Sequence, residues 1–145
     1  MSRYEKTKRY LSQLRFIDYA IKKKTHEMKQ LRDFLENTSV ELKADRVQSS
    51  GSADRLGDSV AKIVDLEKET IALVAKYALT QKTINEQLDD LSKPEYSMIL
   101  HLKYFGDKKL YEIGKELGYD ENYIRKLHGR ALKEFESRFS STYEN

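Results

Sequence analysis

Apolar residues recur every three or four positions along most of the chain, which is the spacing of one face of an α-helix. From Tyr4 to about Asn37 no helix-breaking residue occurs, and the pattern predicts a first long helix. Its apolar positions follow the spacing of a coiled-coil seam and are Leu14, Ile17, Ile21, Met28, Leu31 and Leu35. Lys24 interrupts this register. A rod of roughly 50 Å with so narrow an apolar stripe needs a partner helix.

A second long helix is predicted from Ser59, a favourable N-cap residue, to Leu91. The residues expected to face its partner are Ile63, Leu66, Thr70, Leu73, Val74, Tyr77, Ile84, Leu88 and Leu91. Between the two helices, residues 38–58 are rich in serine and also contain glycine, so we expect a flexible link. Two rods of similar length joined in this way most simply form an antiparallel hairpin. Pairing between two chains is the alternative, because a dimer would better cover Phe16, Phe34 and Tyr77.

Three shorter helices are predicted after Pro94, which the first turn of a helix accepts. The first of them ends near Gly106, and the second stops at Gly118, the residue best able to take a positive φ. Asp120 is the expected N-cap of the third, whose apolar stripe is Ile124, Leu127, Ala131 and Phe135. Two short helices around a glycine turn form a helix-turn-helix, which favours duplex DNA as the partner.

These elements predict an all-α protein in which a long, coiled-coil-like antiparallel helical hairpin precedes a three-helix helix-turn-helix module. The hairpin would span residues 1–92, including the link 38–58, and the module residues 93–139, followed by a tail of residues 140–145. No apolar run approaches the ~20 residues that a membrane span needs. No signal peptide is recognised either, so we expect a cytoplasmic protein without a membrane partner.

Composition and charge further limit the classes of function that fit the chain. Residues 1–37 carry ten Lys/Arg against five Asp/Glu, residues 38–92 seven against ten, and residues 93–138 ten against eight, so both ends are basic. Cysteine is absent, which excludes disulfides and thiol chemistry. The three histidines are far apart in sequence, and there is no phosphate loop or nucleophile motif. We therefore expect no enzymatic activity, no metal and no cofactor.

The segment from Glu95 to Gly106, followed by Leu110 to Gly118, strongly resembles the fourth region of primary sigma factors, which reads the −35 promoter element. The shared pattern is an apolar helix ending in an aromatic–glycine pair, then leucine-x-glutamate-isoleucine-glycine, a glycine turn, and a reading helix that closes in Ala131-Leu132. It covers residues 94 to about 138. The resemblance implies that the reading helix lies in the major groove and that the preceding helix crosses the DNA backbone.

By this resemblance, the base contacts fall on Glu121, Asn122, Tyr123, Arg125 and Lys126. Arg125 keeps the family's residue type and is suited to donate two parallel hydrogen bonds to guanine. The first three positions depart from the family, which argues against a standard −35 element as the target. Solvated or structural roles stay open for them, and the Glu121 carboxylate also suits a helix N-terminus. The expected phosphate contacts are Lys108, Lys109, Lys115, Arg130 and Lys133.

A helical N-terminal half joined to a sigma-like C-terminus also resembles, more loosely, the late-gene activators of Gram-positive phages and prophages of the RinA and ArpU type. This resemblance implies a transcription activator in the bacterial host cytoplasm, at the nucleoid, that binds promoter DNA and engages host RNA polymerase. The N-terminal helices would form a homodimer or contact the polymerase. Two alternatives stay open: a small terminase subunit that binds DNA for genome packaging, and a polymerase-binding adaptor.

Overall fold

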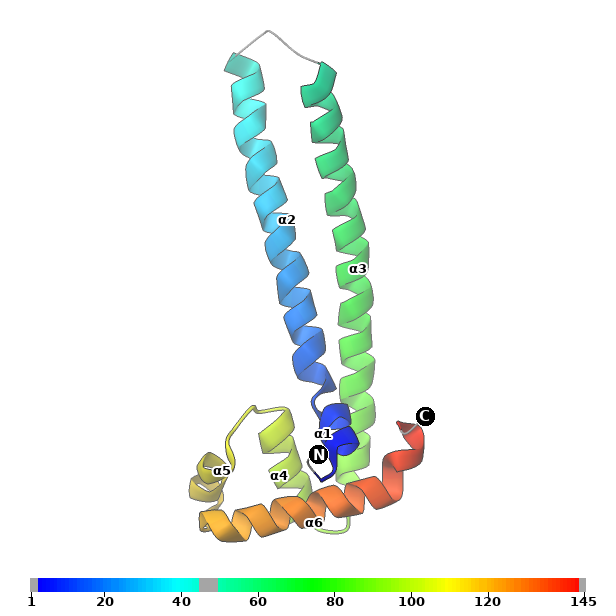
Figure 1. The fold of residues 1–145 in the computed structure, drawn as a ribbon, viewed down its shortest axis with the longest axis vertical. Coiled ribbons are helices and arrows are strands. Elements are labelled where there is room, and N and C mark those ends of the chain that lie inside the picture. Colours follow the sequence, from blue (N-terminus) through cyan, green and yellow to red (C-terminus); the bar gives the residue numbers. More distant parts are fainter. Residues whose placement is uncertain (1–2, 45–49, 144–145) are drawn as a thin grey trace. The chain divides into compact units, whose positions relative to one another are not determined.

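The computed structural model describes residues 3–44 and 50–143, with side chains described for residues 3–38 and 54–143. Over these residues the chain is all-helical, which confirms the predicted fold class. The helices are α1 (Glu5–Leu11), α2 (Gln13–Ala44), α3 (Ser50–Asp89), α4 (Pro94–Tyr104), α5 (Leu110–Leu117), α6 (Glu121–Phe139) and the short 3-10 helix η1 (Ser140–Thr142), drawn in Figure 1. Residues 17–76 form one compact unit, here the hairpin unit, and residues 1–16 with 77–145 form another, here the helix-turn-helix unit.

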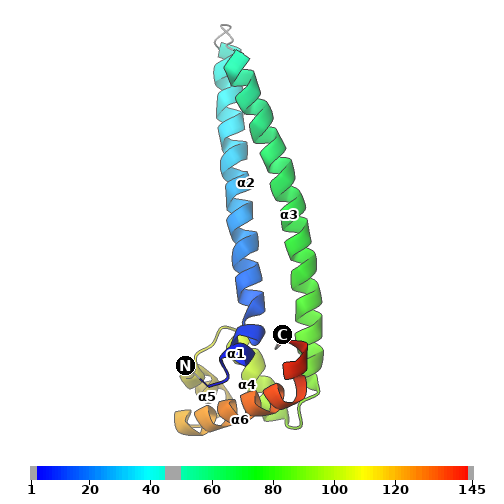
Figure 2. The same ribbon diagram turned by 45° about the vertical axis from the view of Figure 1, so that its right-hand side comes forward.

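In the hairpin unit, α2 and α3 run antiparallel beside each other, as Figures 1 and 2 show from two directions. Ile17 and Met28 of α2 and Ile63 and Leu66 of α3 are buried, as the seam pattern predicts. Lys24, which interrupts the apolar register, forms an ion pair between the helices, since its Nζ lies 2.7 Å from Oε2 of Glu69. The break in the apolar register is therefore part of the hairpin's cross-helix contacts.

The predicted ends of the long helices are wrong in two places. The first helix is interrupted at Ser12, so that α1 and α2 are separate helices. The expected flexible link 38–58 is helical over residues 38–44 and 50–58, while residues 45–49 lie outside the described part of the chain. Serine, asparagine and threonine lower helix propensity by less than about 0.7 kcal/mol each, so packing along a long hairpin can carry helices through them.

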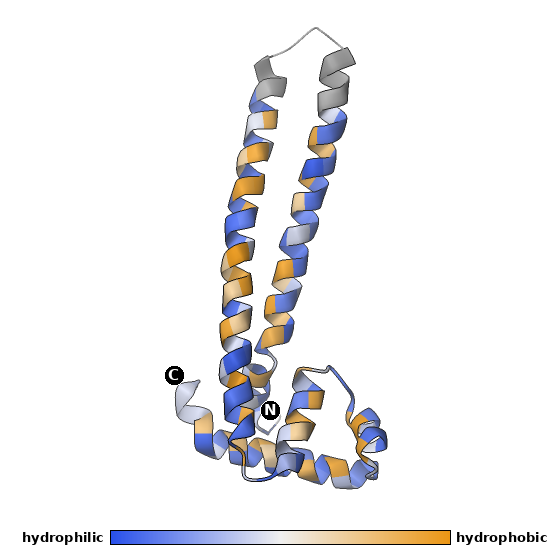
Figure 3. Cartoon of the chain, turned by 180° about the vertical axis from the view of Figure 1, so that it is seen from behind, coloured by the Kyte–Doolittle hydropathy of each residue, from blue (hydrophilic) through white to orange (hydrophobic). Residues whose placement is uncertain are grey.

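The hairpin unit also carries apolar residues that its own seam does not cover. Val60, Val64, Ile71 and Val74 of α3 have between 42% and 69% of their surface exposed. Their spacing of four, seven and three residues places them on one face of α3, beside the face that packs on α2. We call these four residues the α3 stripe. The prediction that Val74 faces α2 is therefore wrong, and Figure 3 shows the distribution of apolar residues along both helices.

The core of the helix-turn-helix unit is built from more of the chain than residues 93–139. Ile99, Ile113, Ile124 and Phe135 of α4, α5 and α6 are fully buried, as predicted. Leu11 of α1 and Ile84 and Leu88 of α3 complete the same apolar cluster. The contacts thus divide the chain near residues 16 and 76 and not at residue 92, because α1 and the last turns of α3 supply part of this core.

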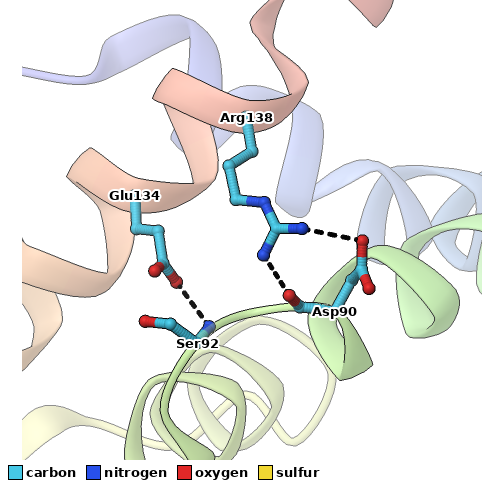
Figure 4. Close-up of polar contacts among 4 residues, drawn as sticks. All are labelled: Asp90, Ser92, Glu134 and Arg138. Carbon is cyan, nitrogen blue, oxygen red and sulfur yellow. Dashed lines mark hydrogen bonds and ion pairs between the residues drawn. The ribbon is translucent and has the colours of Figure 1, made fainter.

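Polar contacts fix the far end of α6 to the connection between α3 and α4 (Figure 4). Arg138 donates to the backbone carbonyl of Asp90, and its Nη2 lies 2.9 Å from Oδ2 of the same residue. One turn earlier, Glu134 accepts from the Ser92 backbone N–H at 3.0 Å. Hydrogen bonding from the Ser92 side chain, together with this backbone bond, holds the pKa of Glu134 below its ordinary value. These contacts tie the C-terminal half of α6 to the connection between α3 and α4.

Candidate nucleic-acid interface

The turn between α5 and α6 is set by two glycines. Gly118 has φ +79° and ends α5, as the sequence predicts for a residue without a Cβ. Gly114, inside α5, lies so close to the turn that an added Cβ would be 2.8 Å from the Tyr119 carbonyl oxygen. The Tyr119 N–H donates to the Gly114 carbonyl at 2.8 Å and closes the turn. The two helices are therefore joined at close range, in the arrangement expected of a helix-turn-helix.

Asp120 starts α6 in the predicted way. Its Oδ1 accepts from the Tyr123 backbone N–H at 2.9 Å, which satisfies one of the unpaired donors of the first helical turn. Behind this cap the predicted stripe is buried, at Ile124, Leu127, Ala131 and Phe135. One face of α6 is therefore covered by its own unit, and the opposite face is exposed.

All five residues expected to contact bases are exposed on the first two turns of α6: Glu121, Asn122, Tyr123, Arg125 and Lys126. Arg125 is held by Glu121, with Nη2 2.9 Å from Oε1, an exposed pair of the kind that contributes little stability. The Tyr123 ring packs edge-on against Tyr119, with centroids 5.0 Å apart, while 42% of Tyr123 stays exposed. The arrangement presents a guanidinium, an amide, a phenol and an ammonium together.

The five expected phosphate contacts separate into two groups. Arg130 and Lys133 lie on α6 and line the same hollow as Arg125 and Lys126. The other three lie on α5 or just before it: Lys108 pairs with Glu116, Lys109 is the N-cap of α5, and Lys115 lies over the Tyr111 ring. The lining of this hollow includes none of these three. The structure thus brings four of the predicted α6 cations to one place.

Sequence reasoning missed the part of that hollow that comes from the start of the chain, which is Arg3, Tyr4 and Lys8. The only signal for them was the positive charge of residues 1–37, which carries no information about where the segment packs.

His128 also lines the hollow and contacts Tyr104 of α4. Its Nε2 is 3.0 Å from the Tyr104 hydroxyl, and only 9% of the residue is exposed. Burial, and to a smaller extent the positive charges of Lys103 and Lys8, together lower the pKa of His128 to about 4. Burial also raises the pKa of the Tyr104 hydroxyl, against a smaller opposing effect of Arg15. The pair is therefore a neutral hydroxyl–imidazole contact at neutral pH.

Two further observations concern chemistry and surroundings. No group of three His, Asp or Glu side chains in the described residues is placed to hold a metal ion. In that same part of the chain, no helix combines the length and the apolar character needed to cross a membrane.

Comparison with known proteins gives no match: no family model fits the chain, and no curated protein or solved structure is significantly similar to it.

Proposed function

We propose that this protein is a sequence-specific, duplex-DNA-binding transcription regulator whose α6 reads the major groove. The observation that supports this most is the exposed face of α6, which carries Asn122, Arg125 and Lys126 beyond a tight turn while its apolar face is buried. An α-helix with its side chains is about 10–12 Å wide, and the major groove admits it. α5 then crosses the DNA backbone, as in other helix-turn-helix proteins.

Within this proposal several exposed residues of α6 have defined roles. Arg125 donates two hydrogen bonds to guanine after leaving Glu121, which holds the guanidinium near the helix start in the unbound protein. Asn122 reads adenine, and Arg130 and Lys133 contact phosphates. The sigma-like pattern of residues 94–138 supports a role in transcription and a contact with RNA polymerase. The looser resemblance to late-gene activators supports a phage or prophage origin and activity in the bacterial host cytoplasm.

The proposal includes self-association of the hairpin unit. The α3 stripe has the spacing of a coiled-coil face, and the described part of α2 packs on a different face of α3. A second copy of the chain supplies a matching stripe, and two-fold pairing would match a two-fold arrangement of DNA half-sites.

The experiment is a selection of binding sites for the full chain from a pool of random DNA duplexes, followed by titration of the selected duplex at physiological salt. Arg125→Ala should weaken binding to the selected site by about 1–3 kcal/mol, the usual discrimination of a bidentate contact. Arg125→Lys is the matched variant, because it keeps the charge but loses the bidentate geometry. It should bind the selected site weakly while keeping the parent's affinity for a random duplex.

Three outcomes count against the proposal. One is the recovery of no preferred sequence. Another is equal binding of the parent and Arg125→Ala to the selected site. The third is a stable complex with RNA polymerase alongside sequence-blind DNA binding, which would favour the adaptor instead.

A further inference from the structure

A basic hollow of about 460 Å³ lies between the start of the chain and the outward side of α6. Both segments belong to the helix-turn-helix unit. Among the described residues that line it there is no Asp or Glu, and the basic ones are Arg3, Lys8, Arg125, Lys126, Arg130 and Lys133. The carboxylate of Glu121 pairs with one of them, Arg125, and Arg3 and Lys8 have contacts of their own as well. Six positive charges around one hollow create a strongly attractive potential for a polyanion.

α1 is held firmly beside α6, so its cations are positioned and not merely tethered. Leu11 is fully buried in the core that α6 shares. The buried Thr7 hydroxyl donates to Glu136 of α6 at 3.2 Å and lies 2.7 Å from the Tyr143 hydroxyl. Tyr10 stacks on Tyr143, with ring centroids 4.4 Å apart. Lys8 therefore lies on a short helix whose position is fixed by Thr7 before it and by Tyr10 and Leu11 after it.

Gly129, in the middle of α6, also lines the hollow. A Cβ added there would have no atom within 4 Å, so nothing in the described part of the chain requires a glycine. Glycine in a helix interior is unfavourable because of its conformational entropy. The missing methyl instead leaves room for the close approach of a ligand to the helix backbone.

We propose that α1 and α6 together form one phosphate-binding groove, in which Arg3 and Lys8 hold the sugar–phosphate backbone of the DNA that α6 reads. This inference rests on the proposed function and adds to it a second, non-local element of the DNA interface. After burial, the positive charges of Lys103 and Lys8 also contribute to the lowered pKa of His128, which lines the groove. The contacts to phosphate carry no sequence information, so they raise affinity for every duplex alike.

The first test measures how the affinity of the full chain for a random duplex of about 30 base pairs, roughly three helical turns, depends on salt. Lys8→Gln should lower the slope of log affinity against log salt by about 0.9, which is about fivefold weaker binding at about 0.15 M salt. The selected site should lose affinity by the same factor. Lys6→Gln is the matched control: it removes the same charge from an exposed position on another side of α1. Its slope should equal that of the parent.

The outcomes separate the two proposals. If Lys8→Gln and Lys6→Gln behave alike while Arg125→Ala loses the selected site, the α1 groove is wrong and the reading role of α6 stands. If the parent binds neither duplex, both proposals fall. Should Lys8→Gln not fold, as judged by its thermal unfolding, Arg3→Gln makes the same measurement at the other α1-side cation of the groove.

A second test uses one substitution that should raise the stability of the protein but lower its affinity for DNA. Gly129→Ala should raise the melting temperature, because alanine is the better helix former, yet weaken binding to both duplexes because the methyl enters the groove. Gly57→Ala in α3 is the control, since an added Cβ there also meets nothing within 4 Å. It should raise the melting temperature and leave binding unchanged. Equal DNA affinities for Gly129→Ala and the parent would contradict close approach of the backbone at this point.

Discussion

The buried histidine at position 128 makes the stability of this protein depend on pH in a defined direction. Burial first, then Lys103 and Lys8, lowers the pKa of His128 from 6.5 to about 4. In the unfolded chain this imidazole takes up a proton near pH 6.5, whereas in the folded protein it resists protonation until about pH 4. Its contribution to folding is therefore fully present above pH 6.5 and is lost as the pH falls toward 4.

We expect this histidine alone to remove about 3 kcal/mol of stability over that range, at about 1.36 kcal/mol per pH unit. Urea unfolding of the parent and of His128→Gln at several pH values between neutral and about 4.5 measures the effect, since the difference between the two proteins cancels other titrating groups. The parent should lose more stability than the variant on acidification. Tyr104→Phe, which removes the hydrogen-bond partner but keeps the buried imidazole, should retain the parent's pH dependence. Parallel curves for the parent and His128→Gln would refute the argument.

At the scale of single elements, the start of α6 depends on one side chain. Asp120 caps the helix through the Tyr123 N–H at 2.9 Å. Asp120→Ala should lower the free energy of unfolding by about 1 kcal/mol, within the 0.5–2 kcal/mol measured for such caps. Asp120→Asn keeps the accepting oxygen and should stay close to the parent. Chemical denaturation checks both, and a loss of equal size in the two variants would mean that charge, not capping, matters at this position.

The short helices were predictable because their signals are local. Helix start and stop signals act within one turn of the chain. Such signals mark helix boundaries in the structure, as expected, at Pro94, Gly118 and Asp120. The break at Ser12 was not predictable from the same rules, because serine neither requires nor forbids helix. Its position follows from the packing of Leu11 into a core formed by residues more than seventy positions later. Tertiary contacts of this kind leave no mark on local periodicity.

The candidate site likewise has a part that local signals predict and a part that depends on tertiary contacts. The exposure of Glu121, Asn122, Tyr123, Arg125 and Lys126 follows from the apolar stripe behind them, so the sequence predicted it. The joining of α1 to α6 depends on the Thr7 contacts with Glu136 and Tyr143, which connect residues more than a hundred positions apart. No spacing rule relates such residues. The cations that α6 contributes to the basic hollow could therefore be predicted from the sequence, whereas Arg3 and Lys8 could not.

At the scale of the whole molecule, the last turns of α3 belong to the unit that carries the proposed DNA-reading helix. Ile84 is fully buried in that unit's core, whereas Ile71, thirteen residues earlier in the same helix, is 69% exposed. Ile84→Ala should destabilise the protein by about 2–5 kcal/mol. Ile71→Ala should stay within about 0.5 kcal/mol of the parent. Urea unfolding followed by the near-ultraviolet signal of the tyrosines tests the pair, and similar losses in both would place the core elsewhere.

The last expectation is self-association, whose strength depends on the free energy gained by burying the α3 stripe and on the cost of association. A symmetric pair of copies would bury eight half-exposed aliphatic side chains of the α3 stripe, each contributing on the order of 1 kcal/mol. Association itself costs about 4–15 kcal/mol. With the lowest of these costs the net gain is about 4 kcal/mol, which corresponds to a Kd of about 1 mM, so the proposed dimer is weak and its population rises with concentration.

Light scattering over a concentration series should therefore show the mass rising from 17.0 kDa toward twice that value. Ile71→Lys places a charge in the stripe and should hold the protein at the mass of one chain. Leu79→Lys is its control, because Leu79 is equally exposed at 69% but lies on a different face of α3. It should dimerise like the parent. A parent that stays monomeric would remove the stripe as an interface, and a closed ring of many copies would favour the DNA-packaging alternative over the regulator, because only the ring requires each copy to use two different surfaces.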